Sequence, residues 1–403
     1  MSNPGSVTDN PDRKRIALFL DGTWNTVGDN TNVWRLKALC ATRSADGARQ
    51  LVYYSKGVGT SFGEKVRGGM LGYGLDRAIT DAYEWLVEAY EPGDEIFIFG
   101  FSRGAYTARS LAGFIAKCGL LRPGAALGVA QLFERYRKDD TVPTIRQLAE
   151  MPAATAATLT LEERWMLVEA MPVPIRMIGV WDTVGALGIP FGNIPGLSRS
   201  GFKFLHTGLR VPLENAYHAV AVDEHRQAFA PTLWTKKIRD GVPANTMAAP
   251  RPIESVEQRW FVGAHANVGG GCRSDLLAQR PLQWLMQKAE RLGLAFRGTV
   301  EPDANMLQAA ISNSFREFAW GLYAKAKLGR PFYRTIGEPP RPFPGGYDEI
   351  VNETIDASVF DRWRVDADYR PKNLLDWGRH YGVDPAALTQ PVLTHEPSRV
   401  VPA

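Results

Sequence analysis

Residues 100–104 read Gly-Phe-Ser-Arg-Gly, a serine held between two glycines. The segment follows a short apolar run at 95–99, typical of a buried strand, and precedes residues 105–117, whose apolar spacing predicts a helix. A strand–turn–helix context holds such a serine on a sharp turn, with its hydroxyl exposed at the carboxyl end of the strand. We therefore predict that Ser102 is a nucleophile, the plainer alternative being a serine that only caps the helix.

The two flanking glycines, Gly100 and Gly104, have a supporting role in this interpretation. A side chain at either position would strike the neighbouring strand or helix, because the turn is tight. We expect both glycines to be needed for packing rather than for chemistry.

A serine hydroxyl needs a base near pH 7, and His265 is the candidate. It follows a predicted strand at 258–262 and lies in a glycine-rich loop at 263–271, whose small side chains would let an imidazole approach the serine. His218 lies inside a predicted strand, and we expect it to be packed in the core.

The base in turn needs an acid that orients it, and the chain order in hydrolases with this turn is serine, acid, histidine. Asp182 ends the predicted strand at 175–181, where the chain turns sharply. Asp223 also ends a predicted strand and is the rival. With Glu224 and Arg226 beside it, Asp223 is better interpreted as part of a structural charge cluster.

An acyl-transfer site also needs N–H donors for the oxyanion. One donor is expected from the backbone of Arg103, directly after the nucleophile. The other is expected from the loop after the strand at 16–20, at the amide of Thr23 or Gly22. Asp21 is expected to hold that loop in shape.

These residues need a scaffold of alternating strands and helices, which the sequence predicts. Short, mainly apolar runs indicate strands at 16–20, 51–54, 95–99 and 175–181, and two more strands are predicted at 216–222 and 258–262. Helical spacing appears at 75–90, 105–117 and 276–292, with a weaker pattern around 303–328. Such alternation predicts a mainly parallel sheet with helices on both faces, here an α/β-hydrolase fold with helical and loop lid insertions.

The predicted organisation is one main domain with additions. Residues 1–13 are expected to be a flexible leader, 14–378 the hydrolase domain and 379–403 an irregular C-terminal tail. A helical insert is expected at about 121–173, where Thr160 and Glu163 have the spacing of a capping box. An apolar, lid-like loop is expected at about 184–214, with simple core packing as the alternative.

Composition narrows the functional classes. The net charge is +4 and the basic residues are scattered, so no nucleic-acid groove is expected. The chain has three cysteines in no metal-binding spacing, and we expect no metal and no cofactor. There is no run of 18 apolar residues and no apolar signal segment near Met1. A cytoplasmic location, or export without a Sec signal by a contact-dependent secretion system, is expected.

Several segments together resemble a known family. They are residues 20–25 with 31–33, 57–60, 100–106, 180–184, 223–224 with 229–234, 265 with 268–271, and 369–374. The set resembles the α/β-hydrolase family typified by the catalytic domain of type VI secretion phospholipase effectors, the first lipase-effector family. The resemblance implies a Ser102–Asp182–His265 triad and lipase or phospholipase A activity. Asn267 stands where that family commonly has Asp.

The expected function is a serine hydrolase that forms an acyl-enzyme, acting on a lipid or small ester and contacting the membrane peripherally. One alternative is an esterase or thioesterase with a non-lipid substrate, which chain-length profiling would distinguish. A second is a non-catalytic binding module on a hydrolase fold, which a fluorophosphonate probe would not label.

Overall fold

The computed structural model describes residues 13–22, 30–57, 68–138, 142–152, 157–184, 213–241, 251–272, 275–317 and 329–402. The central feature is an eight-stranded sheet with the order β13-β12-β9-β7-β6-β3-β1-β2. Its strands are β1 (Lys14–Leu20), β2 (Arg49–Ser55), β3 (Glu95–Phe101), β6 (Met177–Trp181), β7 (Ala216–Ala221), β9 (Val256–Phe261), β12 (Glu353–Ile355) and β13 (Val392–Leu393). Neighbouring strands run parallel, except that β13 is antiparallel to β12.

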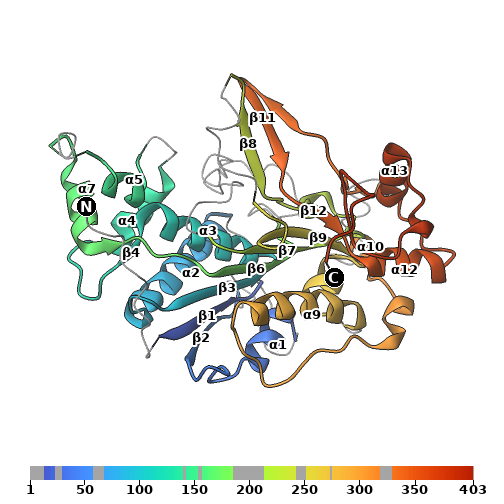
Figure 1. Cartoon of the computed structure of the whole chain (residues 1–403), viewed down its shortest axis with the longest axis horizontal. Helices are drawn as coiled ribbons and strands as arrows, with labels where there is room; N and C mark the ends of the chain where they lie inside the picture. Colours follow the sequence, from blue (N-terminus) through green and yellow to red (C-terminus); the bar gives the residue numbers. More distant parts are fainter. Residues whose placement is uncertain are drawn as a thin grey trace.

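Helices cover both faces of this sheet (Figure 1). Residues of β1 alternate between two apolar clusters: Ile16 and Leu18 pack on one face, and Ala17 and Phe19 on the other. The first cluster includes residues of α2 (Gly68–Ala89) and α3 (Arg103–Cys118), and the second includes residues of α1 (Asn32–Leu39) and α9 (Leu276–Arg291). Strands buried on both faces read as apolar runs, which is why the sequence identified them. The predicted α/β-hydrolase fold is confirmed.

The strand register brings several chain segments to one edge. Phe101 at the end of β3 pairs with Trp181 at the end of β6, which pairs with Ala219 of β7. Ala221 at the end of β7 pairs with Phe261 at the end of β9. Because these strands are parallel, the residues that follow them all emerge at the carboxyl edge of the sheet.

The described part of the segment at 121–173, the predicted helical insert, holds several short helices. It contains α4 (Val129–Arg137), α5 (Ile145–Ala149) and α7 (Leu161–Glu169), and is flanked by paired strands β4 (Leu120–Leu121) and β5 (Ala170–Met171). The predicted capping box is present: the Glu163 N–H donates to Thr160 Oγ1 at 3.3 Å, and the Thr160 N–H donates to Glu163 Oε2 at 2.9 Å. These helices lie at the opposite end of the molecule from α12 (Ala357–Val365) and α13 (Lys372–Tyr381) (Figure 1).

Two predicted segments fall largely outside the described residues. Of the leader at 1–13, the structure describes Arg13 alone. Of the lid-like loop at 184–214, it describes Val184, Leu213 and Glu214. Both assignments stay predictions.

The C-terminal part is more regular than the sequence indicated. The weak helical pattern around 303–328 corresponds to η5 (Ala304–Gln308) and α10 (Ser314–Glu317) in its described part. β10 (Arg341–Phe343) and β11 (Gly346–Ile350) form an antiparallel sheet with β8 (Thr235–Arg239). The predicted irregular tail at 379–403 contains η7 (Pro385–Ala387) and β13, which extends the central sheet. A two-residue edge strand has no sequence period of its own, so its pairing with β12 depends on tertiary contacts.

Candidate active site

Ser102 lies on the sharp turn between β3 and α3. Its backbone has φ of 58° and ψ of −121°, a region that non-glycine residues rarely adopt. The Ser102 N–H donates to the Trp181 carbonyl at 3.1 Å. The turn therefore holds the serine in a strained conformation at the carboxyl edge of the sheet.

The two glycines of the turn have no room for a side chain. A Cβ on Gly100 would lie 2.5 Å from the Gly104 carbonyl oxygen. A Cβ on Gly104 would overlap the backbone carbonyl oxygens of Leu20 and Asp21 at the end of β1. Each glycine thus permits a close backbone approach that a larger residue would prevent.

His265 bridges Ser102 and Asp182. Its Nε2 lies 2.8 Å from Ser102 Oγ, and its Nδ1 lies 2.5 Å from Asp182 Oδ2. The sequence predicted a loop at this position, but His265 begins a short helix, α8 (His265–Gly269). Asn267 Oδ1 accepts the Ala264 N–H at 3.1 Å and so caps the start of this helix. The three predicted residues are thus brought into one hydrogen-bonded chain.

Two aromatic rings enclose His265. The ring of Phe101 lies 4.7 Å away between centroids, and Phe229 packs edge-on at 5.0 Å. Burial lowers the pKa of His265, although the hydrogen bond and charge of Asp182 oppose that effect. The imidazole is therefore neutral at pH 7. With its proton on Nδ1 facing Asp182, its Nε2 can accept the serine proton.

The buried carboxylate of Asp182 takes part in four hydrogen bonds, one of them with His265. Burial alone would raise its pKa, but the nearby Arg334 guanidinium and His265 hold that pKa well below its usual range. The Ala221 N–H donates to Oδ1 at 3.0 Å. Arg334 donates to Oδ1 at 2.6 Å and to Oδ2 at 2.9 Å. Asp182 is thus an ionised carboxylate with its orientation fixed from several sides.

Arg334 was missed by the sequence analysis. It lies in a weakly patterned segment, far along the chain from Ser102 and His265, and no motif surrounds it. A lone arginine carries no sequence signal for such a position, so the contact is visible only after folding.

The rival acid, Asp223, faces elsewhere. Its Oδ2 accepts the Gly263 N–H at 2.8 Å and the Tyr369 hydroxyl at 3.2 Å. Beside it, Glu224 accepts two side-chain hydrogen bonds from Arg226 at 2.8 Å each, and the His265 N–H at 3.3 Å. This charge cluster supports the backbone of His265.

His218 is packed in the core, as predicted. Its Nε2 accepts the Thr183 N–H at 3.0 Å. Burial, together with the charge of Arg109, lowers the pKa of His218 to about 3. It is therefore a neutral acceptor that fixes the backbone next to Asp182.

The structure bears differently on the three predicted oxyanion donors, the backbone amides of Arg103, Gly22 and Thr23. Arg103 is the first residue of α3, so its backbone N–H belongs to the first turn beside Ser102. The Gly22 N–H donates to Asp21 Oδ1 at 2.8 Å. Because it points at that carboxylate, Gly22 is disfavoured as an oxyanion donor. Asp21 Oδ2 also accepts the Thr31 hydroxyl at 2.6 Å, which links the end of β1 to the residue that precedes α1. Thr23 lies outside the described residues.

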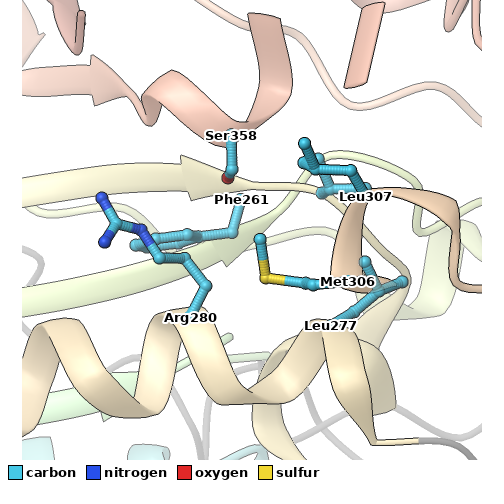
Figure 2. A pocket seen from close by; sticks show the side chains of 7 residues that line it. Phe261, Leu277, Arg280, Met306, Leu307 and Ser358 are labelled. Atoms are coloured by element: carbon cyan, nitrogen blue, oxygen red, sulfur yellow. The ribbon is translucent and has the colours of Figure 1, made fainter. Parts of the chain in front are cut away.

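A small pocket, whose lining includes none of the triad residues, lies between β9, α9 and α12 (Figure 2). Its lining is mainly apolar, with Arg280 and Ser358 as the polar members. Both of these bind Asp356: Ser358 Oγ donates to it at 2.6 Å and Arg280 Nε at 3.3 Å. Because its polar groups are already paired within the protein, this pocket is a packing feature.

Two further properties concern the described part of the chain. No cluster of three or more His, Cys, Asp or Glu residues there could hold a metal ion. No helix in these ranges combines the length and the apolar character that a membrane crossing requires.

The sequence is similar to several known proteins. It is 31% identical over 242 residues to an uncharacterized protein of Saccharomyces cerevisiae, covering 55% of this chain and 33% of the yeast protein. The chain therefore spans about a third of that relative.

The solved structures that resemble this chain have low sequence identity to it and low TM-scores. An uncharacterized protein from Pseudomonas aeruginosa is 18% identical with a TM-score of 0.43, covering 79% of this chain and 51% of that one. The Tle1 effector bound to the VgrG spike of the type 6 secretion system is 18% identical with a TM-score of 0.32, covering 67% and 55%. Esterase 2 of Thermogutta terrifontis is 14% identical with a TM-score of 0.34, covering 72% and 87%.

The match to a family model is the comparison that assigns this chain to a family. Residues 14–288 match the model of the type VI secretion (T6SS) phospholipase effector Tle1-like catalytic domain. This range holds the turn at Ser102, the strand end at Asp182 and the helix start at His265. The chain belongs to the family of type VI secretion phospholipase effector Tle1-like catalytic domains.

Proposed function

We propose that this protein is a serine hydrolase that cleaves carboxylic esters through an acyl-enzyme, with Ser102, His265 and Asp182 as its catalytic triad. One observation carries the proposal. A serine in a strained turn lies 2.8 Å from a buried, neutral imidazole, whose other nitrogen lies 2.5 Å from a buried carboxylate. This is the arrangement that turns a weak hydroxyl into a nucleophile.

The reaction proceeds in two halves. Ser102 Oγ attacks the ester carbonyl carbon while His265 Nε2 takes the hydroxyl proton. The carbonyl electron pair moves onto oxygen, and backbone N–H groups stabilise that oxyanion. When the pair returns, the bond to the leaving alcohol breaks and the alcohol takes the proton from His265. Water, activated by His265, then hydrolyses the acyl-enzyme and restores Ser102.

The residues have separate tasks in this scheme. Asp182 keeps the His265 proton on Nδ1 and stabilises the imidazolium that forms. We propose the backbone N–H groups of Arg103 and Thr23 as the oxyanion donors. The buried position of His265 between two phenylalanine rings keeps it neutral until it takes the serine proton.

The proposed substrate class is a lipid ester, most specifically a phospholipid. Membership of a phospholipase effector family supports this class. A protein that acts on such lipids would contact a membrane peripherally. Delivery by a contact-dependent secretion system is proposed on the same ground.

The test is a substrate panel applied to the wild type and to Ser102→Ala. We expect wild type to hydrolyse p-nitrophenyl esters and phospholipid vesicles, and Ser102→Ala to lose about 10⁴–10⁶-fold in kcat. Ser110→Ala is the matched control, because Ser110 is a buried serine farther along α3. A fluorophosphonate probe should label wild type and Ser110→Ala, but not Ser102→Ala.

The outcomes separate the alternatives. Activity on short esters without activity on vesicles would replace the lipase proposal with a small-ester hydrolase. Absence of both hydrolysis and probe labelling in folded wild type would overturn the enzymatic proposal and favour a binding module.

A further inference from the structure

Arg334 lies against the candidate acid from a part of the chain beyond the family match. The match ends at residue 288, whereas Arg334 lies between α10 and β10. Both guanidinium arms bind Asp182, one to each carboxylate oxygen, at 2.6 and 2.9 Å. The side chains of both residues are fully buried. A buried, two-armed arginine–carboxylate pair fixes the plane of the carboxylate as well as its charge.

The guanidinium is itself held by the backbone around the site. Its Nη1 donates to the Ala221 carbonyl at 2.8 Å, and its Nη2 donates to the Phe229 carbonyl at 2.6 Å. Ala221 also donates its N–H to Asp182, and the Phe229 ring packs on His265. Arg334 thus ties together three of the segments that surround the imidazole.

The segment that carries Arg334 is hydrogen-bonded to the loop that follows β7. The Phe332 N–H donates to the His225 carbonyl at 3.0 Å, and the His225 ring nitrogen Nδ1 lies 3.1 Å from the Phe332 carbonyl. These contacts hold Phe332, two positions before Arg334, against the loop that follows β7. The guanidinium therefore approaches Asp182 from a fixed backbone.

We infer that Arg334 is a positioning residue of the proposed hydrolytic site: it holds Asp182 in the orientation that His265 requires and reduces the negative charge that the imidazole experiences. This inference rests on the proposed function. The charged groups that act on His265 are Asp182 and Glu224, which favour its protonation, and Arg226, which disfavours it. Arg334 acts through Asp182, and the rings of Phe101 and Phe229 carry no charge.

Charge and geometry are separable by substitution. Arg334→Lys keeps a cation but loses the two-armed fork, whereas Arg334→Met loses both. Arg259→Met is the matched control: Arg259 is also fully buried and pairs with Glu257 at 2.7 Å and Asp356 at 3.4 Å. That network includes none of the triad residues.

The first measurement is kcat and KM on a short p-nitrophenyl ester as a function of pH. We expect both Arg334 variants to lose about 10–100-fold in kcat, the usual cost of removing a group that orients a functional side chain. KM should change little. The acid limb of kcat/KM should keep its position in Arg334→Lys and move to higher pH in Arg334→Met, by about one pH unit, because the unpaired carboxylate favours the imidazolium.

The controls make each outcome decisive. Arg259→Met should lower the melting temperature, yet leave the acid limb and the kcat of the folded protein within about twofold of wild type. If Arg334→Met does not fold, Arg334→Lys carries the test. The inference is overturned if folded Arg334→Lys keeps wild-type kcat, or if Arg334→Met behaves as Arg259→Met does.

A second readout does not depend on activity. Titration of the His265 ring by NMR, assigned with a His265→Asn variant, should give a higher pKa in Arg334→Met than in wild type. If wild type hydrolyses no ester and matches Ser102→Ala, the proposed function fails, but this titration still tests the Arg334 inference. An unchanged His265 pKa would contradict it.

Discussion

The site has two sides: the turn around Ser102, here the serine side, and the surroundings of Asp182, here the acid side. The two sides are built in different ways. The Ser102 turn is assembled within one stretch of chain, from the end of β3 to the first turn of α3, with β1 alongside. Asp182 is held by groups from distant segments, including Ala221, His265 and Arg334. A local turn can be encoded by spacing, whereas a buried carboxylate needs partners that only the fold supplies.

The two sides should respond differently to substitution. Around Ser102 itself, changes to the flanking glycines should affect the folded backbone, since those glycines allow close packing. Changes on the acid side should affect catalysis more than stability, because that side sets the orientation and proton affinity of His265.

Apart from the loss of the nucleophile itself in Ser102→Ala, the largest effect is expected on the acid side. Asp182→Asn should lower kcat by about 10⁴-fold, since an amide favours the wrong imidazole tautomer and leaves Arg334 without its carboxylate. Asp223→Asn is the matched control, because Asp223 bonds to Gly263 and Tyr369 rather than to His265. Steady-state kinetics on a short ester measure both. A greater loss from Asp223→Asn would reassign the acid.

A smaller effect, on stability, is expected at the serine side. Gly104→Ala should lower the free energy of unfolding by about 3 kcal/mol, because its Cβ would overlap backbone atoms of Leu20 and Asp21, which cannot easily move. Gly298→Ala, where nothing lies within 4 Å of the added Cβ, should change it by less than about 0.5 kcal/mol. Urea denaturation compares them. Equal stabilities of the two variants would show that the turn is looser than described.

The smallest expected effect is on the pH dependence of kcat/KM, to which both sides of the site contribute. Only neutral His265 can accept the Ser102 proton, so kcat/KM should rise as the pH rises through the His265 pKa. Burial lowers that pKa, hence the acid limb should have its midpoint below the ordinary histidine value of about 6.5. A pH profile at constant ionic strength, with folding monitored by tryptophan fluorescence, measures it. A midpoint above pH 7 would show that Asp182 outweighs burial.

Much of the scaffold followed from the sequence because its strands are buried on both faces. The runs at β1, β3, β6 and β7 were recognisable as short, mainly apolar segments, and the parallel order of the strands placed their ends together. The short strands β10 to β13 were not recognisable: β11 is partly exposed, and β12 and β13, with three and two residues, are too short to show a period.

The sequence by itself determined the turn at Ser102 and the candidates Asp182 and His265. Glycine spacing, strand ends and chain order are local properties, and the structure brings those three side chains within hydrogen-bonding distance. Only the tertiary structure decided what surrounds Asp182. Arg334 reaches it from a segment without a motif, because a buried ion pair depends on which chain segments meet in space and leaves no periodic trace in the sequence.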